Sequence, residues 1–202
     1  MSKKYFDDTH FKGENFTEKN LPKGEYDNCT FKDCLFANTH LGEIVFSDCT
    51  FEQCDMSMAK VTGTAFRNVQ FKNCKLLGLN FDACNGFLLA LSFDNCLLNF
   101  SSFYQLKLKN TAFKDCQLEG VEFVETDLTH AVFKNANLLD AKFEQTILAN
   151  ADLRTAYNFS LDPNINNIKK AKFSKHNIVG LLDKYDIVIE CIVVLLYCCI
   201  VG

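Results

Sequence analysis

The stretch AFKDCQLEGVEFVETDLTHAVFKNANLLDAKFEQTILANADLRT, residues 112–155, decides the fold because it repeats every five residues. Each fifth residue from Phe113 to Leu153 is Phe or Leu, and the residue two positions before it is small or apolar. A helix repeats its faces every 3.6 residues and a strand every two, so neither element accounts for this pattern. The sequence therefore predicts a coil built from five-residue units.

The same repeat extends back to Phe6. In steps of five, sixteen apolar positions run from Phe6 to Phe81, and fourteen more run from Leu88 to Leu153 after a slip of two residues at 85–86. We call these positions centres. Sixteen of the 20 Phe residues fall on centres, where random placement would put about a fifth of them.

The slip is the one interruption of the repeat. Asn-Gly favours a turn, so we expect the two extra residues to bulge outward at a corner. The bulge is either a tolerated insertion or a small functional protrusion, with Phe87 and Phe100 as exposed contacts beside it.

A second period of 20 residues lies over the first. Cys34, Cys54 and Cys74 are 20 residues apart, each two residues before a centre. Four five-residue sides make one coil, so equivalent positions stack on neighbouring coils about 4.8 Å apart. Backbone groups then pair between coils, the centres fill the axis, and the small residues fill the corners.

This pattern resembles the pentapeptide repeat family, whose unit is a small residue, Asn or Asp, Leu or Phe, and two variable residues. Residues 136–140 (ANLLD) and 151–155 (ADLRT) match the unit in full. The resemblance implies an all-β fold, a right-handed quadrilateral β-helix. We expect this pentapeptide repeat solenoid over residues 1–157, a C-terminal capping and dimerisation segment over 158–190, and an apolar tail over 191–202.

The segment after the repeats is expected to contain a short α-helix. Ser174 is a suitable N-cap for a helix from Lys175 to about Lys184, and its apolar stripe would consist of Ile178, Leu181, Leu182 and Tyr185. The helix would cover the open end of the coil, whose unpaired backbone invites edge-to-edge association, or pack on a second copy of itself. In pentapeptide repeat proteins that protect topoisomerases such an element makes the dimer, so the resemblance implies a homodimer.

The apolar tail contains eleven consecutive apolar residues, from Cys191 to Val201. A membrane-spanning helix needs about 20, so a membrane role is not expected. A membrane anchor stays an alternative to a buried dimer strand or an aggregation-prone end. The polar N-terminal residues contain no apolar leader, which makes a cytoplasmic, reducing compartment the expectation.

Reactive side chains give no sign of catalysis. Four His residues are spread along the chain, and no Gly-rich phosphate loop or catalytic motif occurs. The 11 Cys residues include no Cys-x-x-Cys pair, which argues against a zinc site and a disulfide framework. The stacked Cys residues are expected to be buried packing residues. We therefore expect no enzyme activity, no cofactor and no metal.

Charge varies along the chain. Residues 1–55 carry a net charge of −5, residues 56–114 carry +5, and residues 115–155 carry −5. The acidic coils are either an ordinary solvated surface or an imitation of DNA phosphate that competes for a basic DNA-binding groove. Together with Phe87, the residues expected to carry partner binding are Asp115, Glu119, Glu122, Glu125, Asp127, Asp140, Glu144 and Asp152.

The architecture looks like the quinolone-resistance (Qnr) type of pentapeptide repeat protein, which binds DNA gyrase or topoisomerase IV and shields it from drug and toxin. The resemblance implies a topoisomerase as partner, with no direct contact to nucleic acid. The alternative is a generic protein-interaction or structural scaffold with no topoisomerase target.

Overall fold

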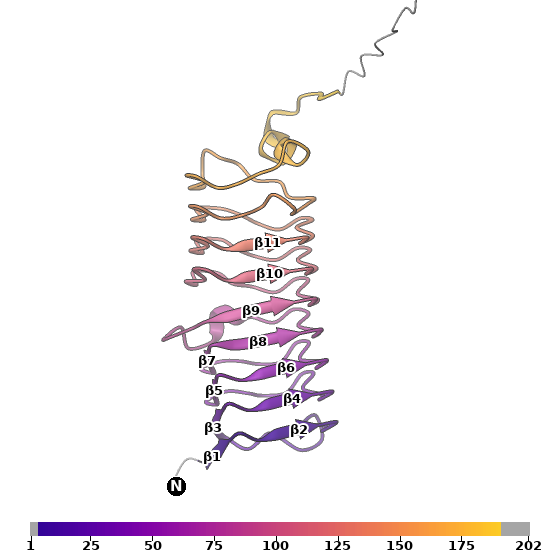
Figure 1. Ribbon diagram of the computed structural model, residues 1–202, viewed down its shortest axis with the longest axis vertical. Coiled ribbons are helices and arrows are strands. Elements are labelled where there is room, and N and C mark those ends of the chain that lie inside the picture. Colours follow the sequence, from indigo (N-terminus) through magenta and orange to yellow (C-terminus); the bar gives the residue numbers. More distant parts are fainter. Residues whose placement is uncertain (1–3, 191–202) are drawn as a thin grey trace, which may run out of the picture.

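The computed structural model describes residues 4–190, which form a rod-shaped parallel β-solenoid of about seven turns (Figure 1). Neighbouring turns pair in parallel with a register of 20 residues, so that Phe31 lies beside Phe51 and Phe113 beside Phe133. The N-terminal strands lie at one end of the rod and the last helical turns at the other. The register confirms the expected coil of 20 residues.

Two of the four sides form regular sheets. One side is a four-stranded sheet of β1 (Lys4–Asp7), β3 (Gly24–Asp27), β5 (Val45–Ser47) and β7 (Ala65–Arg67). The next side is a seven-stranded sheet of β2 (His10–Lys12), β4 (Thr30–Lys32), β6 (Thr50–Glu52), β8 (Val69–Lys72), β9 (Leu91–Asp94), β10 (Ala112–Lys114) and β11 (Val132–Lys134). The remaining sides pair through single bridges such as Leu97 with Gln117 and Glu122 with Lys142.

The centres fill the axis of the rod as predicted. Phe113 stacks on Phe133 of the next turn with ring centroids 5.0 Å apart and planes 6° apart. It meets Phe123 of the opposite side edge to face, at 5.7 Å and 80°. Both geometries are favourable for aromatic pairs. Every centre from Phe16 to Leu153 is buried except Leu88.

The small residues two positions before the centres do more than fill the corners. Their polar side chains donate hydrogen bonds to backbone carbonyl oxygens of the turn before, such as Thr126 Oγ1 to Phe103 O at 2.8 Å and Cys54 Sγ to Phe31 O at 3.2 Å. Asn166 continues this ladder beyond the sequence repeats, because its Nδ2 donates to Phe143 O at 2.8 Å. The expectation that the Cys residues only pack was therefore incomplete.

Most five-residue sides end with a left-handed residue, two positions after the centre. Examples are Asp115 (φ 52°), Asn135 (φ 53°) and Gly120 (φ 63°). Gly, Asn and Asp adopt this conformation at the lowest cost. This requirement explains why they are common at the ends of the sides.

The slip changes the register by two residues. Ala65 still pairs with Asn85, but Val69 pairs with Leu91, 22 residues later. A 3₁₀ helix, η1 (Phe81–Ala83), precedes the extra residues. The expectation that Leu88 is a centre was wrong: its side chain is 63% exposed, while Leu91 is buried. The turn absorbs the extra residues between Gly86 and Ala90, where Leu89 instead of Leu88 packs against the core, and the regular inward frame resumes at β9.

The C-terminal segment contains 3₁₀ helices, η2 (Ile178–Leu181) and η3 (Asp183–Tyr185), instead of the expected α-helix. Ser174 closes the turn that precedes η2, since its Oγ accepts the Asn177 N–H at 3.2 Å and its N–H donates to Asn177 Oδ1 at 2.9 Å, but the N-cap residue of η2 is Asn177. Gly180 lies within η2, where its backbone packs closely against Phe159, and a Cβ there would collide with the Phe159 carbonyl oxygen. This close contact accepts no residue larger than glycine at position 180.

The solenoid continues beyond the last clear sequence repeat. Ile147 pairs with Asn167, and Asp152 pairs with Lys172. None of the helices in residues 4–190 has the length and apolar character needed to cross a membrane. The apolar tail, 191–202, lies outside the described residues.

Candidate partner-binding surface

Because the centres point inward, the outward residues of each side make up the surface available to a partner. The predicted acidic residues do not share one side. Glu122, Glu125 and Glu144 lie on the side whose centres are Phe81, Phe103, Phe123 and Phe143, which we call the Phe123 side. Glu119 and Asp140 lie around the corner that leads into it.

The other three acidic residues lie apart from this surface. Asp115 and Asp152 belong to the side of the seven-stranded sheet, two sides away from the Phe123 side. Asp127 belongs to the side that follows the Phe123 side along the chain. A register count in steps of 20 residues could have separated these positions from the sequence alone.

Neighbouring cations further reduce the negative potential at all three of these residues. Arg154 Nη2 lies 2.6 Å from Asp152 Oδ2, and this contact holds the pKa of Asp152 below its ordinary value. Lys109 Nζ lies 3.3 Å from Asp127 Oδ2. Partial burial acts to raise the pKa of Asp127, but hydrogen bonds from Thr129 and the Lys109 ammonium lower it overall. Asp115 accepts a hydrogen bond from Asn135 Nδ2 at 2.9 Å, and Lys114 Nζ lies 3.8 Å away.

The carboxylates of the Phe123 side are held mainly by neutral donors from the turn before. Asn99 Nδ2 donates to Glu119 at 3.1 Å, Ser102 Oγ donates to Glu122 at 3.0 Å, and Gln105 Nε2 donates to Glu125 at 2.7 Å. Neutral donors orient a carboxylate without cancelling its charge. Lys142, which follows Glu122 by one turn, is the basic residue within this group. The group therefore presents oriented negative charge on a rigid scaffold.

Exposed apolar residues border the Phe123 side. Phe100 is 67% exposed at the corner that leads into it, and Tyr104 lies on the side itself. Phe87, 65% exposed, lies in the slip where the next side begins. Both exposed Phe residues were predicted from the sequence, whereas Tyr104 was missed because it occupies an ordinary outward position.

Two corner glycines make room for exposed apolar side chains. A Cβ at Gly120 would lie 2.7 Å from Phe100 Cδ1, and a Cβ at Gly78 would lie 2.5 Å from Met58 Sδ. The large residue of each pair lies one turn before its glycine, at the same corner of the coil. One edge of the Phe100 ring therefore lies against Gly120 at this corner.

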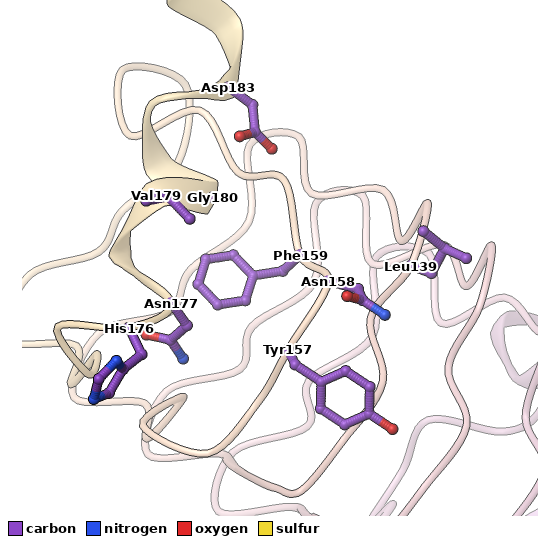
Figure 2. Close-up of a pocket in the computed structure, with 9 residues that line it drawn as sticks. All are labelled: Leu139, Tyr157, Asn158, Phe159, His176, Asn177, Val179, Gly180 and Asp183. Carbon is purple, nitrogen blue, oxygen red and sulfur yellow. The ribbon is translucent and has the colours of Figure 1, made fainter. Parts of the chain in front are cut away.

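The C-terminal segment bounds a shallow pocket of about 400 Å³ (Figure 2). Figure 2 shows the Phe159 ring lying between the last turn and η2, while the Tyr157 ring points away from η2. Of the residues predicted to make a dimer, Ile178 and Tyr185 are exposed, Leu182 is half-buried, and Leu181 packs against the core. The four residues therefore do not form one exposed stripe.

The described residues hold no group of three His, Cys, Asp or Glu side chains that could bind a metal ion. Their eight Cys residues are unpaired.

Comparison with known proteins identifies the fold. Three solved structures of QnrB1, described as a plasmid-mediated fluoroquinolone resistance protein, are similar to this chain. Two trypsin-treated variants match with TM-scores of 0.70 and 0.61, at 14% and 15% identity, covering 93% of this chain in both cases and 92% and 100% of theirs. The full-length protein matches with a TM-score of 0.53 at 14% identity, covering 91% of this chain and 100% of its own.

These identities are low, so the structural likeness shows a shared fold alone. A sequence search of curated proteins found no match. The family model of the pentapeptide repeat region matches residues 24–91, 44–123 and 88–180, which together span most of the chain. The chain therefore belongs to the pentapeptide repeat family.

Proposed function

We propose that this protein is a non-enzymatic protein-binding rod, and that its Phe123 side imitates DNA phosphate and binds DNA gyrase or topoisomerase IV. The observation that carries the proposal is the group of five carboxylates at Glu119, Glu122, Glu125, Asp140 and Glu144, fixed on a rigid coil beside exposed aromatic rings. Charge of one sign at fixed positions steers a basic groove toward it. Aromatic residues are common anchors of protein interfaces.

The choice of a topoisomerase is supported by similarity of form. QnrB1 has a fluoroquinolone-resistance role, and its rod matches this one over nearly its whole length. The residues Asp115, Asp127 and Asp152, which the charge pattern also pointed to, are left out of the proposed contact because they lie on other sides. A cytoplasmic location suits both the proposed target and the unpaired Cys residues.

Binding to purified gyrase and topoisomerase IV tests the proposal. The double variant Glu122→Lys/Glu125→Lys should bind at least about tenfold more weakly, a loss of about 1.4 kcal/mol. Added salt should weaken wild-type binding. The matched control is Asp33→Lys/Asp115→Lys, which changes the net charge equally on the side of the seven-stranded sheet. Equal losses of affinity in both variants would show that binding depends only on net charge, and would contradict a binding site on the Phe123 side.

The alternative is a generic interaction scaffold, which the exposed Met58 and Phe100 favour. It predicts no binding to either topoisomerase and a partner whose capture depends on Phe100. Capture of a topoisomerase subunit that is lost in the Glu122→Lys/Glu125→Lys variant would instead support the first proposal.

We also propose that two copies associate through the C-terminal segment, using Ile178 and Tyr185. Light scattering of the full chain should give a dimer, and Ile178→Asp/Tyr185→Asp should give a monomer with an unchanged thermal midpoint. A dimer that survives this substitution would exclude these residues from the interface.

A further inference from the structure

The slip contains the only Asn-Gly dipeptide of the chain, Asn85-Gly86. The loop that leads into β9 extends beyond the outline of the rod (Figure 1), and residues 85–88 are all exposed. In an Asn-Gly pair the side-chain amide is prone to react with the next peptide nitrogen, because glycine has no Cβ to shield that nitrogen. Whether a folded protein permits this reaction depends on what the side chain and the nitrogen contact.

The backbone anchors Asn85 on the rod and leaves Gly86 free. The Asn85 N–H donates to Thr64 O at 2.8 Å, and Asn85 forms a parallel bridge with Ala65 of the turn before. The Gly86 N–H has no acceptor within residues 4–190. A Cβ built on Gly86 would meet no atom within 4 Å. The nitrogen that could attack the side chain is therefore not held by a hydrogen bond, and it belongs to an exposed residue in open space.

The Asn85 side chain is positioned by a single hydrogen bond. Its Oδ1 accepts the Phe87 N–H at 3.0 Å, whereas its Nδ2 has no acceptor in the described part of the chain. The bond folds the carboxamide back along the Gly86 peptide, since Oδ1 reaches the nitrogen two residues on. A donor at Oδ1 stabilises the negative charge that develops there when a nucleophile attacks Cγ. The unbonded Nδ2 is free to leave.

Two other asparagines that precede a small residue lack this combination. Asn150 precedes Ala151, whose N–H donates to Leu148 O at 3.0 Å and is thus held away from the side chain. Asn135 also precedes an alanine, but its Nδ2 donates to Asp115 Oδ1 at 2.9 Å. A free nitrogen and a free leaving group therefore occur together at the slip and at neither of these positions.

We propose that Asn85 is a site of spontaneous deamidation, in which the deprotonated Gly86 nitrogen attacks Cγ of Asn85. The new bond between this nitrogen and Cγ closes a succinimide ring. The bond from Cγ to Nδ2 breaks, and the leaving group takes up a proton from water and departs as ammonia, which balances the proton that Gly86 lost. Water then opens the ring at either carbonyl carbon and gives aspartate or isoaspartate. Water is the only co-reactant.

The reaction would change the surface beside Phe87. Either product adds a negative charge to the slip at neutral pH, and isoaspartate also leads the backbone through an additional carbon atom. The link between the anchored residue 85 and the exposed ring of Phe87 becomes longer in that form. The inference is independent of the proposed topoisomerase contact, because the reaction needs only the residues of the slip.

The test is ageing of the full, folded chain in buffer over weeks, followed by tryptic mapping. Mass spectrometry of the peptide 76–107 locates the conversion of amide to acid, and a protein isoaspartyl methyltransferase labels the isoaspartate form. An unaged sample corrects for conversion during digestion, and the urea-denatured chain is the positive control for detection. Asn85 should convert while Asn150 remains an amide. The rate should rise from neutral to mildly alkaline pH, because the attack needs the deprotonated nitrogen.

The matched variant is Gly86→Ala. Its added Cβ lies in open space and φ at this position is not in the left-handed region, so the variant should fold with the thermal midpoint of the wild type. The methyl group shields the nitrogen and restricts the backbone, so conversion of Asn85 should slow at least about tenfold. The proposal is overturned if Asn85 stays an amide in the folded wild-type protein, if Asn150 converts as fast as Asn85, or if Gly86→Ala converts at the wild-type rate.

Discussion

At the scale of single residues, inward and outward positions follow different rules. Phe123 stacks between Phe103 and Phe143 of the neighbouring turns, at 5.4 Å and 5.2 Å, and is fully buried. Glu122, one residue before it, faces outward and contacts Ser102. Adjacent positions in the sequence thus have separate places in the structure: Phe123 packs in the core, and Glu122 lies on the surface that we propose for partner binding.

The substitution Phe123→Asp should be severely destabilising, because it removes an aromatic ring from the stack and places an unpaired charge in a dry core. We expect a loss of about 4 kcal/mol or more in the free energy of unfolding. The neighbouring Glu122→Lys should change it by less than about 0.5 kcal/mol. Denaturant unfolding of both variants measures this difference. Similar losses of unfolding free energy would contradict the assignment of Phe123 to the core and Glu122 to the surface.

Burial raises the pKa of the Cys49 thiol to about 12. The thiolate is the reactive form, so native Cys49 should resist alkylation by iodoacetamide at about pH 8, near the pKa of a free thiol. Mass mapping should find Cys49 modified only after denaturation. Modification in the folded protein at the rate of a free thiol would contradict its burial in the corner ladder.

At the scale of elements, the C-terminal segment depends on contacts with the solenoid rather than on its own helical tendency. Leu161 N donates to Gly180 O at 2.9 Å. The Asn177 side chain donates to the carbonyl oxygens of Leu153 and Ala156, at 2.7 Å and 2.8 Å. These bonds satisfy carbonyl groups at the end of the coil and anchor η2 there.

Replacement of Asn177 by Leu should therefore release this segment. It leaves the Ala156 carbonyl without its donor, at a cost of about 1–3 kcal/mol, while the Leu153 carbonyl keeps only the Ala156 N–H at 3.1 Å. Hydrogen exchange should show lower protection of the Leu161 and Leu182 amides, with the β10 and β11 amides unaffected. Lys175→Ala, at an exposed position beside it, is the control. Unchanged protection in Asn177→Leu would mean that Phe159 and Gly180 alone hold the segment.

The sequence predicted most of the solenoid because its information is local and repeated. A five-residue unit specifies each side, and the 20-residue register places Phe113 beside Phe133 without knowledge of any other contact. The α-helix prediction was wrong because it rested on local pattern alone. Contacts such as that of Gly180 with Phe159 come from tertiary packing, which the local pattern does not contain. The prediction that Leu88 is a buried centre was wrong because the sequence does not specify where between Gly86 and Ala90 the two extra residues are absorbed.

At the scale of the whole molecule, the repeat converts a linear pattern of charges into sides of a rod. The acidic residues that seemed to form one acidic coil are divided between sides, and only those near Glu122 gather with Phe100 and Tyr104. Ion pairs such as Arg154 with Asp152 depend on side-chain conformations that the pattern does not specify. The surface that remains is smaller than the charge pattern indicated, but it is rigid.

Gyrase supercoiling in the presence of ciprofloxacin tests the central claim most directly. If the Phe123 side acts as a DNA mimic, the wild-type protein should act at micromolar concentration, which corresponds to a binding free energy of about −8 kcal/mol. It should either restore the supercoiling that the drug inhibits or inhibit supercoiling in the absence of the drug. Glu122→Lys/Glu125→Lys should lose the effect, and Asp33→Lys/Asp115→Lys should retain it. The account is contradicted if the folded wild-type protein neither protects nor inhibits gyrase, and has no effect on topoisomerase IV in the matching relaxation assay.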